Sequence, residues 1–348
     1  MQHSKQTSVN TPAAESISEL TPVTTEELTG RLKLYKSEEG HKIIMKWYDD
    51  VTASIDADVA SKYVPTRFGR THMLAAGPED APALILIPGI AGCAPLWRRQ
   101  IPEFAKHFRV YALDIVGQPG KSDPATPSFL NDDMSEWLLD VLDGLDIRRA
   151  HIAGTSVGGW MAMRFAIYAP ERVEKIVMLS PTGVSRAKLP IKIWITKYLN
   201  KWRAADALQD DLTAKSVTNK SPGRSFGTFD RQLAKLMALC TRHYRVDRSL
   251  GVYNEATGKV DFWAGMKVLR KFFLSEPRAL LRRFTGPGLL ILGEFEILYN
   301  PWKVAKRARK FMPGLETEVI EGAGHAAIYD KPEQANARVI EYLQRQAL

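Results

Sequence analysis

The sequence predicts an α/β fold, in which a mostly parallel β-sheet is flanked by helices and interrupted by an inserted helical segment. Three observations predict it. Short apolar runs that end at small residues alternate with helical patterns. This strand signal disappears between about residues 185 and 285. The chain has 348 residues, 45% hydrophobic and 25% charged, which is enough for one such core with an insertion.

The first part of the predicted sheet is built from repeated strand-helix units. Strands are predicted at 83–89, 109–114, 151–155 and 175–180, and helices at 96–107, 134–145 and 158–168. Upstream, residues 32–35 and 63–76 are predicted as antiparallel edge strands.

The inserted segment shows amphipathic helical stretches instead of strands, at 191–204 and 229–244. The sheet then resumes, with strands at 288–293 and 317–320 and helices at 301–311 and 332–346. We therefore expect a core formed by residues 31–185 and 286–348 and a helical cap formed by 186–285. Residues 1–30, rich in Ser, Thr, Glu and Pro, are predicted to be a disordered leader.

Several classes of protein are disfavoured by what the sequence lacks. No window approaches the roughly 20 consecutive apolar residues that span a bilayer, and the first residues show no apolar run of secretory length. Cys93 and Cys240 match no metal or redox spacing, so reduced thiols are expected. These observations predict a cytoplasmic protein with no transmembrane segment, metal or cofactor.

The most specific motif is Gly154-Thr155-Ser156-Val157-Gly158, a G-x-S-x-G between a predicted strand and a predicted helix. Glycines on both sides of the serine permit a cramped turn that lifts the hydroxyl above the sheet. The helix N-terminus behind it presents unpaired N–H groups, which suit a developing oxyanion. Ser156 is therefore the candidate nucleophile; the alternative interpretation is a small-residue turn that serves close packing.

A serine hydroxyl needs a base, and His325 is the candidate. It follows a late predicted strand in Gly322-Ala323-Gly324-His325, a flexible loop at the proper end of the sheet. A structural histidine is the alternative, but the other histidines have weaker contexts. The base in turn needs an acid to hold its tautomer, and Glu294 and Glu296, directly after the strand 288–293, compete for that role.

Together these features resemble the α/β-hydrolase superfamily, in its esterase-like serine hydrolase branch. The resemblance covers about residue 32 to the C-terminus and rests on Pro88-Gly89, the turn from Asp114 to Asp123, the elbow at Ser156, the Gly-Glu-x-acid turn and the loop before His325. It implies Glu296 as the triad acid, at a position where the superfamily usually has Asp. The oxyanion hole implied by the resemblance consists of the backbone N–H groups of Ile90 and Val157.

The positive charge of the chain is concentrated in the predicted cap. The net charge is +9, and between Arg186 and Arg283 there are 21 basic and 8 acidic residues. These cations fit a mouth that attracts an anionic substrate, an acidic membrane surface, or simply a solvated helical face. They include Arg242, Arg245, Arg248, Lys267, Arg270, Lys271, Arg282 and Arg283. No recognised motif accompanies the charge, so nucleic-acid binding is not expected.

The expected function is acyl transfer to water through a Ser-His-Glu triad and an acyl-enzyme, on a small-molecule acyl substrate. A carboxylesterase is the first interpretation. Thioesterase, lactonase and carbon–carbon bond hydrolase activities are alternatives on the same fold, because the fold does not fix the substrate. A protein of this fold that binds a ligand without turnover is the alternative from another class.

Overall fold

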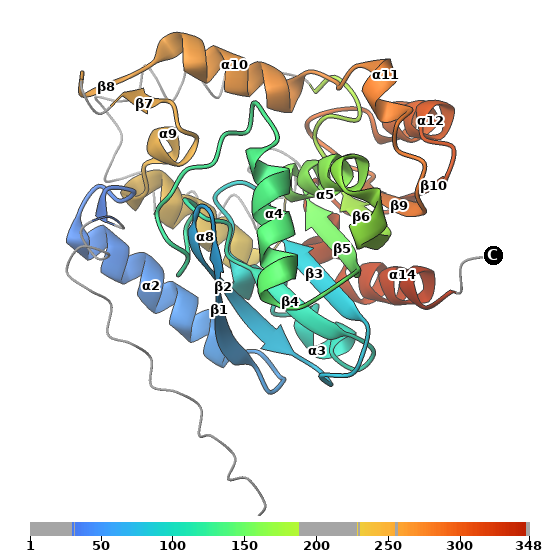
Figure 1. The fold of residues 1–348 in the computed structure, drawn as a ribbon, viewed down its shortest axis with the longest axis horizontal. Coiled ribbons are helices and arrows are strands. Elements are labelled where there is room, and N and C mark those ends of the chain that lie inside the picture. The colour runs from blue at the N-terminus through green and yellow to red at the C-terminus, as the bar shows by residue number, and fades with distance from the viewer. Residues whose placement is uncertain (1–29, 31, 188–227, 229, 255–256, 346–348) are drawn as a thin grey trace, which may run out of the picture.

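The computed structural model describes residues 30, 32–187, 228, 230–254 and 257–345. Its centre is an eight-stranded sheet with the order β1-β2-β4-β3-β5-β6-β9-β10 (Figure 1). The strands are β1 (Ala60–Thr66), β2 (Gly69–Ala76), β3 (Ala83–Ile87), β4 (Arg109–Leu113), β5 (Ala150–Thr155), β6 (Val173–Leu179), β9 (Gly288–Gly293) and β10 (Leu315–Ile320). From β4 to β10 all neighbours are parallel, whereas β1 and β2 form an antiparallel edge. The predicted fold class is confirmed.

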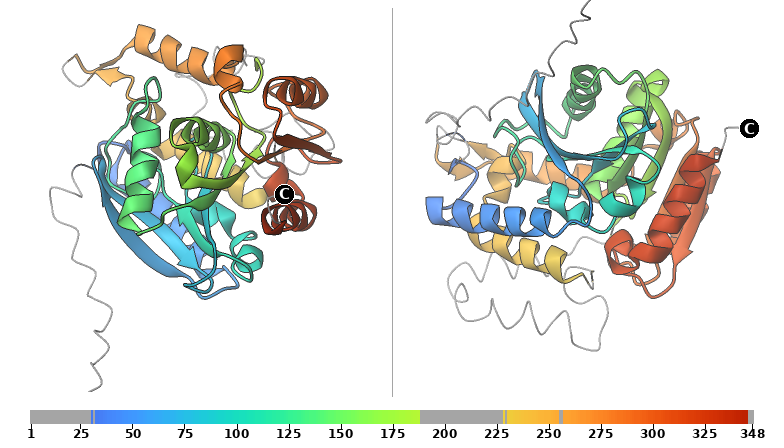
Figure 2. Two further views of the ribbon diagram at one scale, coloured as in Figure 1. Left: turned by 45° about the vertical axis from the view of Figure 1, so that its right-hand side comes forward. Right: turned by 90° about the horizontal axis from the view of Figure 1, so that it is seen from below.

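Helices cover both faces of this sheet, as the alternation of β3 requires (Figures 1 and 2). Ile85 and Ile87 face one apolar core, which they share with α4 (Asp133–Gly144), α5 (Val157–Tyr168) and α12 (Pro301–Phe311). Leu84 and Leu86 face the other, with α2 (Glu38–Ala53), α3 (Ile101–Phe104), α13 (Ala327–Asp330) and α14 (Pro332–Gln344). Because both faces of each central strand are buried, the strands appear in the sequence as continuous apolar runs.

The N-terminal part differs from the prediction. The strand expected at 32–35 is wrong, because only Tyr35 makes a bridge, to Tyr244. The helix α2 that follows was not expected. Ser37 caps it by accepting a hydrogen bond from the Gly40 N–H, and Ile44, Trp47, Tyr48 and Val51 form its buried face. The edge strands expected within 63–76 are present as β1 and β2.

The helix expected at 96–107 is broken into two short pieces, a 3₁₀ turn η1 (Ala94–Trp97) and α3. Each piece has a proline in its first turn, Pro95 and Pro102, where the missing N–H costs nothing. A continuous helix over 96–107 would be destabilised by Pro102, which would remove one internal hydrogen bond and clash with the preceding turn.

The described part of the predicted cap is mostly helical. Its helices are α8 (Arg231–His243), α9 (Val246–Ser249), α10 (Phe262–Phe273) and α11 (Arg278–Leu281). Between α9 and α10, two antiparallel strands of two residues each, β7 (Tyr253–Asn254) and β8 (Lys259–Val260), pair with each other. The leader and the helix expected at 191–204 lie outside the described residues, so the division into core and cap stays a prediction. Within the described residues, no helix combines the length and apolarity that crossing a bilayer requires.

Candidate active site

Ser156 lies in the sharp turn between β5 and α5. Its backbone has φ +53° and ψ −114°, a conformation that non-glycine residues rarely adopt. Two contacts hold this turn in place: the Ser156 N–H donates to the Leu179 carbonyl at 2.8 Å, and its own carbonyl accepts from the Thr182 N–H at 3.2 Å. The neighbouring strand β6 thus supports the backbone conformation that lifts the hydroxyl above the sheet.

The glycines around the serine are required by close backbone contacts. A Cβ on Gly154 would lie 2.3 Å from the carbonyl carbon of Gly158, and a Cβ on Gly158 would lie 2.4 Å from the Ile87 carbonyl oxygen. Strand β5, helix α5 and the end of β3 therefore approach one another more closely than any side chain allows. The glycines of the G-x-S-x-G motif therefore serve close packing, and the same turn presents Ser156 as the candidate nucleophile.

His325 lies on the loop after β10, and its imidazole faces the same pocket as Ser156. The preceding backbone is fixed by Asp330, whose Oδ2 accepts from the Gly324 N–H at 2.9 Å. The other oxygen of Asp330 accepts from the Thr228 hydroxyl at 2.7 Å. Asp330, at the end of α13, therefore joins the histidine loop to Thr228, a residue of the predicted cap.

The two candidate acids occupy different positions. The Glu296 Oε2 lies 2.8 Å from the His325 Nδ1, and the Glu296 side chain is fully buried. Glu294 instead accepts a hydrogen bond at 2.9 Å from the Gly322 N–H. The geometry therefore pairs His325 with Glu296, and Glu294 supports the loop that carries the histidine.

The carboxylate of Glu296 also affects the protonation of His325. Burial by itself lowers the pKa of the imidazole, but the charge and the hydrogen bond of Glu296, with a smaller contribution from Asp330, raise it above its ordinary value of 6.5. A buried imidazole with a carboxylate at Nδ1 keeps Nε2 as the position that can accept a proton.

The N–H groups of Ile90 and Val157 are the predicted oxyanion donors. Val157 is the first residue of α5, so its N–H has no partner within the helix. Ile90 lies on the turn after β3, next to Ala91, whose φ is +57°. Neither N–H donates to another described residue. Ile90 lines the same pocket as Ser156.

The turn that carries Ile90 is fixed from behind by Gln118, which sequence reasoning missed. Its Oε1 accepts from the Ala91 N–H at 3.0 Å, and its Nε2 donates to the Ser249 carbonyl on α9 at 3.2 Å. One amide therefore joins the loop at Ile90 to helix α9. A single Gln in a turn leaves no pattern that would have identified this role.

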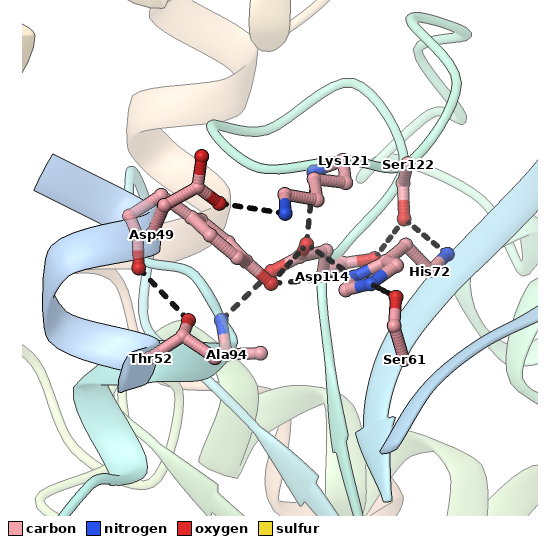
Figure 3. Close-up of polar contacts among 9 residues, drawn as sticks. Asp49, Thr52, Ser61, His72, Ala94, Asp114, Lys121 and Ser122 are labelled. Atoms are coloured by element: carbon pink, nitrogen blue, oxygen red, sulfur yellow. Dashed lines mark hydrogen bonds and ion pairs between the residues drawn. The ribbon is translucent and has the colours of Figure 1, made fainter. Parts of the chain in front are cut away.

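Asp114 fixes the other end of the same turn (Figure 3). This fully buried carboxylate accepts four hydrogen bonds, from the Ala94 N–H, the Lys121 N–H, the Tyr48 hydroxyl and the His72 Nδ1–H, at 2.8 to 3.0 Å. A buried charge is tolerated only when it is fully hydrogen-bonded, and here all four donors supply that compensation.

His72, which the sequence analysis did not consider, forms a serine-histidine-aspartate arrangement with Ser61 and Asp114, away from Ser156. The Ser61 Oγ lies 2.6 Å from the His72 Nε2, and His72 donates to Asp114 (Figure 3). The imidazole is fully buried between β1, β2 and α2, and it does not line the pocket at Ser156. We interpret this arrangement as the anchor of the sheet edge.

The pocket at Ser156 is small and apolar. It has a volume of about 150 Å³, comparable to an engineered protein cavity that holds benzene. Leu233 and Met237 of α8 form one wall, and the rest comes from the core. The described lining is Gly89, Ile90, Gly92, Leu96, Thr155, Ser156, Leu233, Met237, His325, Ala326 and Tyr329. No Lys or Arg is among these lining residues.

None of the three arginines at helical spacing, Arg242, Arg245 and Arg248, is among the described residues that line the pocket. Arg245 donates to the Tyr35 carbonyl at 3.2 Å, and the Arg248 guanidinium lies 4.2 Å from the ring centroid of Tyr253. Both therefore contact other parts of the protein and do not line the pocket. Among the described residues, no group of three or more His, Cys, Asp or Glu is arranged to hold a metal ion.

Comparison with known proteins identifies the family to which this fold belongs. A model of the α/β hydrolase fold family matches residues 82–332, which is well over half of the chain. The chain belongs to the α/β-hydrolase fold family. The matched range runs from the start of β3 to the start of α14, so it contains the elbow, the acid turn and the histidine loop of this hydrolase. The resemblance inferred from the sequence is thereby confirmed.

Two relatives from Bacillus subtilis (strain 168) match over most of their length. Carboxylesterase YbfK is 30% identical over 300 residues, covering 85% of this chain and 92% of the relative. A protein described as uncharacterized carboxylesterase nap is 32% identical over 287 residues, covering 81% and 86%. The crystal structure of YbfK superposes with a TM-score of 0.70 at 28% identity, covering 89% of this chain and 100% of that one. The crystal structure of a naproxen esterase from Bacillus subtilis superposes with a TM-score of 0.68 at 27% sequence identity.

The hydrogen bonds of Asp114 lead to a test of stability. Replacing Asp114 by Ala leaves four buried donors without an acceptor, so we expect the free energy of unfolding to fall by about 3 to 5 kcal/mol. Asp49, whose exposed carboxylate pairs with the Lys121 Nζ at 2.7 Å, is the matched control, and Asp49→Ala should cost at most about 1 kcal/mol. Urea unfolding of the two variants measures the difference; equal losses would contradict the role given to Asp114.

Proposed function

We propose that this α/β hydrolase cleaves carboxylic esters through an acyl-enzyme formed on Ser156, with His325 as general base and Glu296 as the acid that orients it. The single observation that carries the proposal is the 2.8 Å contact between Glu296 and the Nδ1 of His325, in a pocket lined by both His325 and Ser156. The names of the Bacillus relatives favour an ester among the acyl substrates of this fold.

In the first half of the reaction, the Ser156 Oγ attacks the ester carbonyl while the His325 Nε2 accepts its proton. The buried Glu296 carboxylate stabilises the resulting imidazolium. The carbonyl oxygen becomes negative, and the free N–H groups of Ile90 and Val157 are placed to bind it. Each such donor typically contributes about 3 kcal/mol to transition-state stabilisation.

In the second half, the alcohol leaves with the proton from His325, and water takes its place. His325 then accepts a proton from the water, whose oxygen attacks the acyl carbon. As the bond between the acyl carbon and the Ser156 Oγ breaks, His325 returns this proton to Oγ, which releases the acid and regenerates free Ser156. The proposed sequence uses only these residues, the substrate and water. We also propose that the protein works in the cytoplasm on small-molecule substrates, as its sequence predicts.

The size of the pocket supports a preference for a short or compact acyl group. About 150 Å³ between Ile90, Leu233 and Met237 accommodates a group of benzene size, and the lining that the structure describes has no Lys or Arg to pair with an anionic acyl group. A thioester, a lactone or a carbon–carbon bond next to a ketone would meet the same residues. The ester remains our choice because the two Bacillus relatives carry that activity in their names.

The roles of the two glutamates are tested by parallel substitutions. We expect Ser156→Ala to lower kcat for p-nitrophenyl esters by at least about 10⁴-fold and Glu296→Gln by about 10³- to 10⁴-fold. Glu294→Gln keeps an oxygen that can accept from the Gly322 N–H, so it should stay within about tenfold of the wild type. If Ser156→Ala keeps its rate, or if a folded wild type neither hydrolyses esters nor reacts with a fluorophosphonate at Ser156, a ligand-binding role replaces the esterase.

The pH dependence of the reaction tests the pairing of His325 with Glu296. Since His325 acts in its neutral form and its pKa is raised above 6.5, kcat/KM should decline as the pH falls through a value above 6.5. In Glu296→Gln the raising charge is gone and the lowering effect of burial remains, so the acid limb should move to lower pH. An unchanged or upward-shifted limb in the residual activity would contradict the pairing.

Acyl length provides an independent test of the pocket. Among p-nitrophenyl esters, we expect kcat/KM to be highest for short acyl groups from acetate to butyrate, or for benzoate. For the decanoate ester it should be at least about tenfold lower. Met237→Ala shortens a side chain in the pocket wall and so enlarges the pocket, which should move the preference toward longer acyl chains. Leu239→Ala, on the same helix but outside the pocket lining, is the control. A profile that is flat, or that shifts equally in both variants, would count against this acyl pocket.

A further inference from the structure

Three helices along one side of the molecule contain basic residues and no acidic ones. They are α10, α11 and α12, which lie next to one another in the views of Figures 1 and 2. Together with the residues directly after α11, they present nine exposed cations, which we call the basic face: Lys267, Arg270, Arg278, Arg282, Arg283, Lys303, Lys306, Arg309 and Lys310. The nearest carboxylates along the chain are Asp261, which caps α10, and Glu276, which is buried.

The cations of the basic face are crowded where α11 meets α12. Around the ring of Phe311 lie the charged groups of three of these cations, Arg278, Arg282 and Lys310, and of the half-buried Arg307, at 5.1 to 5.7 Å from the ring centroid. Arg307 donates to two backbone carbonyls, and its pKa is lowered by burial and by the charge of Arg278. None of the four forms an ion pair with a described residue.

Contacts with an aromatic ring compensate only a small part of the mutual repulsion of four positive charges. Such a cluster gains most from a bound anion that several cations share. The cluster does not line the pocket at Ser156, so it is not part of the proposed ester site. An anionic partner for this side of the molecule is therefore expected, separate from the substrate.

Exposed aromatic side chains identify the kind of partner. Phe262 and Trp263 at the start of α10 are 65% and 74% exposed, and Trp302 at the start of α12 is 55% exposed. Trp263, Lys267, Arg270 and Leu274 follow one another at helical spacing on the outer side of α10, opposite the buried Val268 and Phe272.

A face that mixes Trp, Phe and Leu with Lys and Arg has the composition of a surface that binds at the boundary between water and lipid. Free phosphate would neutralise the cations and leave these aromatic side chains in water. Anionic lipid headgroups supply both partners: phosphates for the cations and an apolar boundary for the rings.

We propose that the basic face docks the protein on an anionic membrane surface, with phosphate headgroups bound by the cations and Phe262 and Trp263 inserted at headgroup depth. This mode needs no membrane-spanning helix. It is also independent of the proposed esterase activity, because binding to lipid is measured without any substrate.

The test is sedimentation of the full-length protein with sucrose-loaded vesicles of phosphatidylcholine alone or with 30% phosphatidylglycerol. We expect binding to the anionic vesicles only, and weaker binding in high salt. Lys306→Gln/Lys310→Gln should lower the affinity at least about tenfold, since each cation near an anionic surface contributes about fivefold. The control is Lys42→Gln/Lys46→Gln, which removes the same charge at the same spacing from the exposed face of α2 and should change little.

The aromatic part of the surface is tested with Phe262→Ala/Trp263→Ala, against Tyr168→Ala as an exposed aromatic control outside the basic face. We expect the double variant to bind the anionic vesicles with at least about tenfold lower affinity, and the control to bind them with unchanged affinity. Equal binding to both vesicle types, or equal losses in the control variants, would overturn the proposal. So would binding of DNA or free inositol phosphate at the same affinity with no effect of the aromatic substitutions, which would make the site one for a soluble polyanion.

Discussion

The geometry around the candidate nucleophile depends on one buried charge, the carboxylate of Asp114. Its four donors come from α2, β2, the turn after β4 and the backbone of Ala94. Removing water from a carboxylate is tolerable only if every lone pair finds a donor, so all four segments must converge on one point. The Ala94 N–H is the link to function, because it ends the turn on which Ile90 lies. The antiparallel edge of the sheet and helix α2, far from Ser156 in sequence, thereby set the position of an N–H group at the pocket.

The parts of this arrangement that were predictable from sequence are those with a local physical signature. Buried parallel strands must be apolar on both faces, so β3, β5, β6 and β9 could be recognised as short apolar runs. The turn at Ser156 has glycines at the positions where a Cβ would overlap backbone, and that requirement appears directly as G-x-S-x-G. The choice between Glu294 and Glu296 is different. Both follow the same strand, and only the resemblance to the superfamily favoured the residue that the structure places against His325.

The parts that were missed depend on partners far away in the chain. Helix α2 carries its own amphipathic signal in Ile44, Trp47, Tyr48 and Val51, yet the sequence analysis assigned no element to this segment. Gln118 and His72 carry no local signal. Gln118 is significant only because the Ala91 N–H and the Ser249 carbonyl lie on opposite sides of it, and His72 only because Asp114 is buried beside it. A single polar residue in a turn or strand acquires such a role through tertiary contacts alone.

The described part of the predicted cap carries its apolar pocket wall and most of its exposed cations on different helices. Its positive charge suggested, among other interpretations, attraction of an anionic substrate, but the wall that it gives to the pocket is Leu233 and Met237 of α8, both uncharged. Helix α8 packs against α2 through the Trp47 Nε1–H, which donates to Gln232 at 3.0 Å, and it is tied by this contact to the core that holds Ser156. The cations gather instead on α10 and α11 and continue onto α12. The proposed docking of these three helices would leave the pocket wall unchanged, because the described wall consists of other side chains. The position of these cations therefore fits the proposed anionic surface better than an anionic substrate in the pocket.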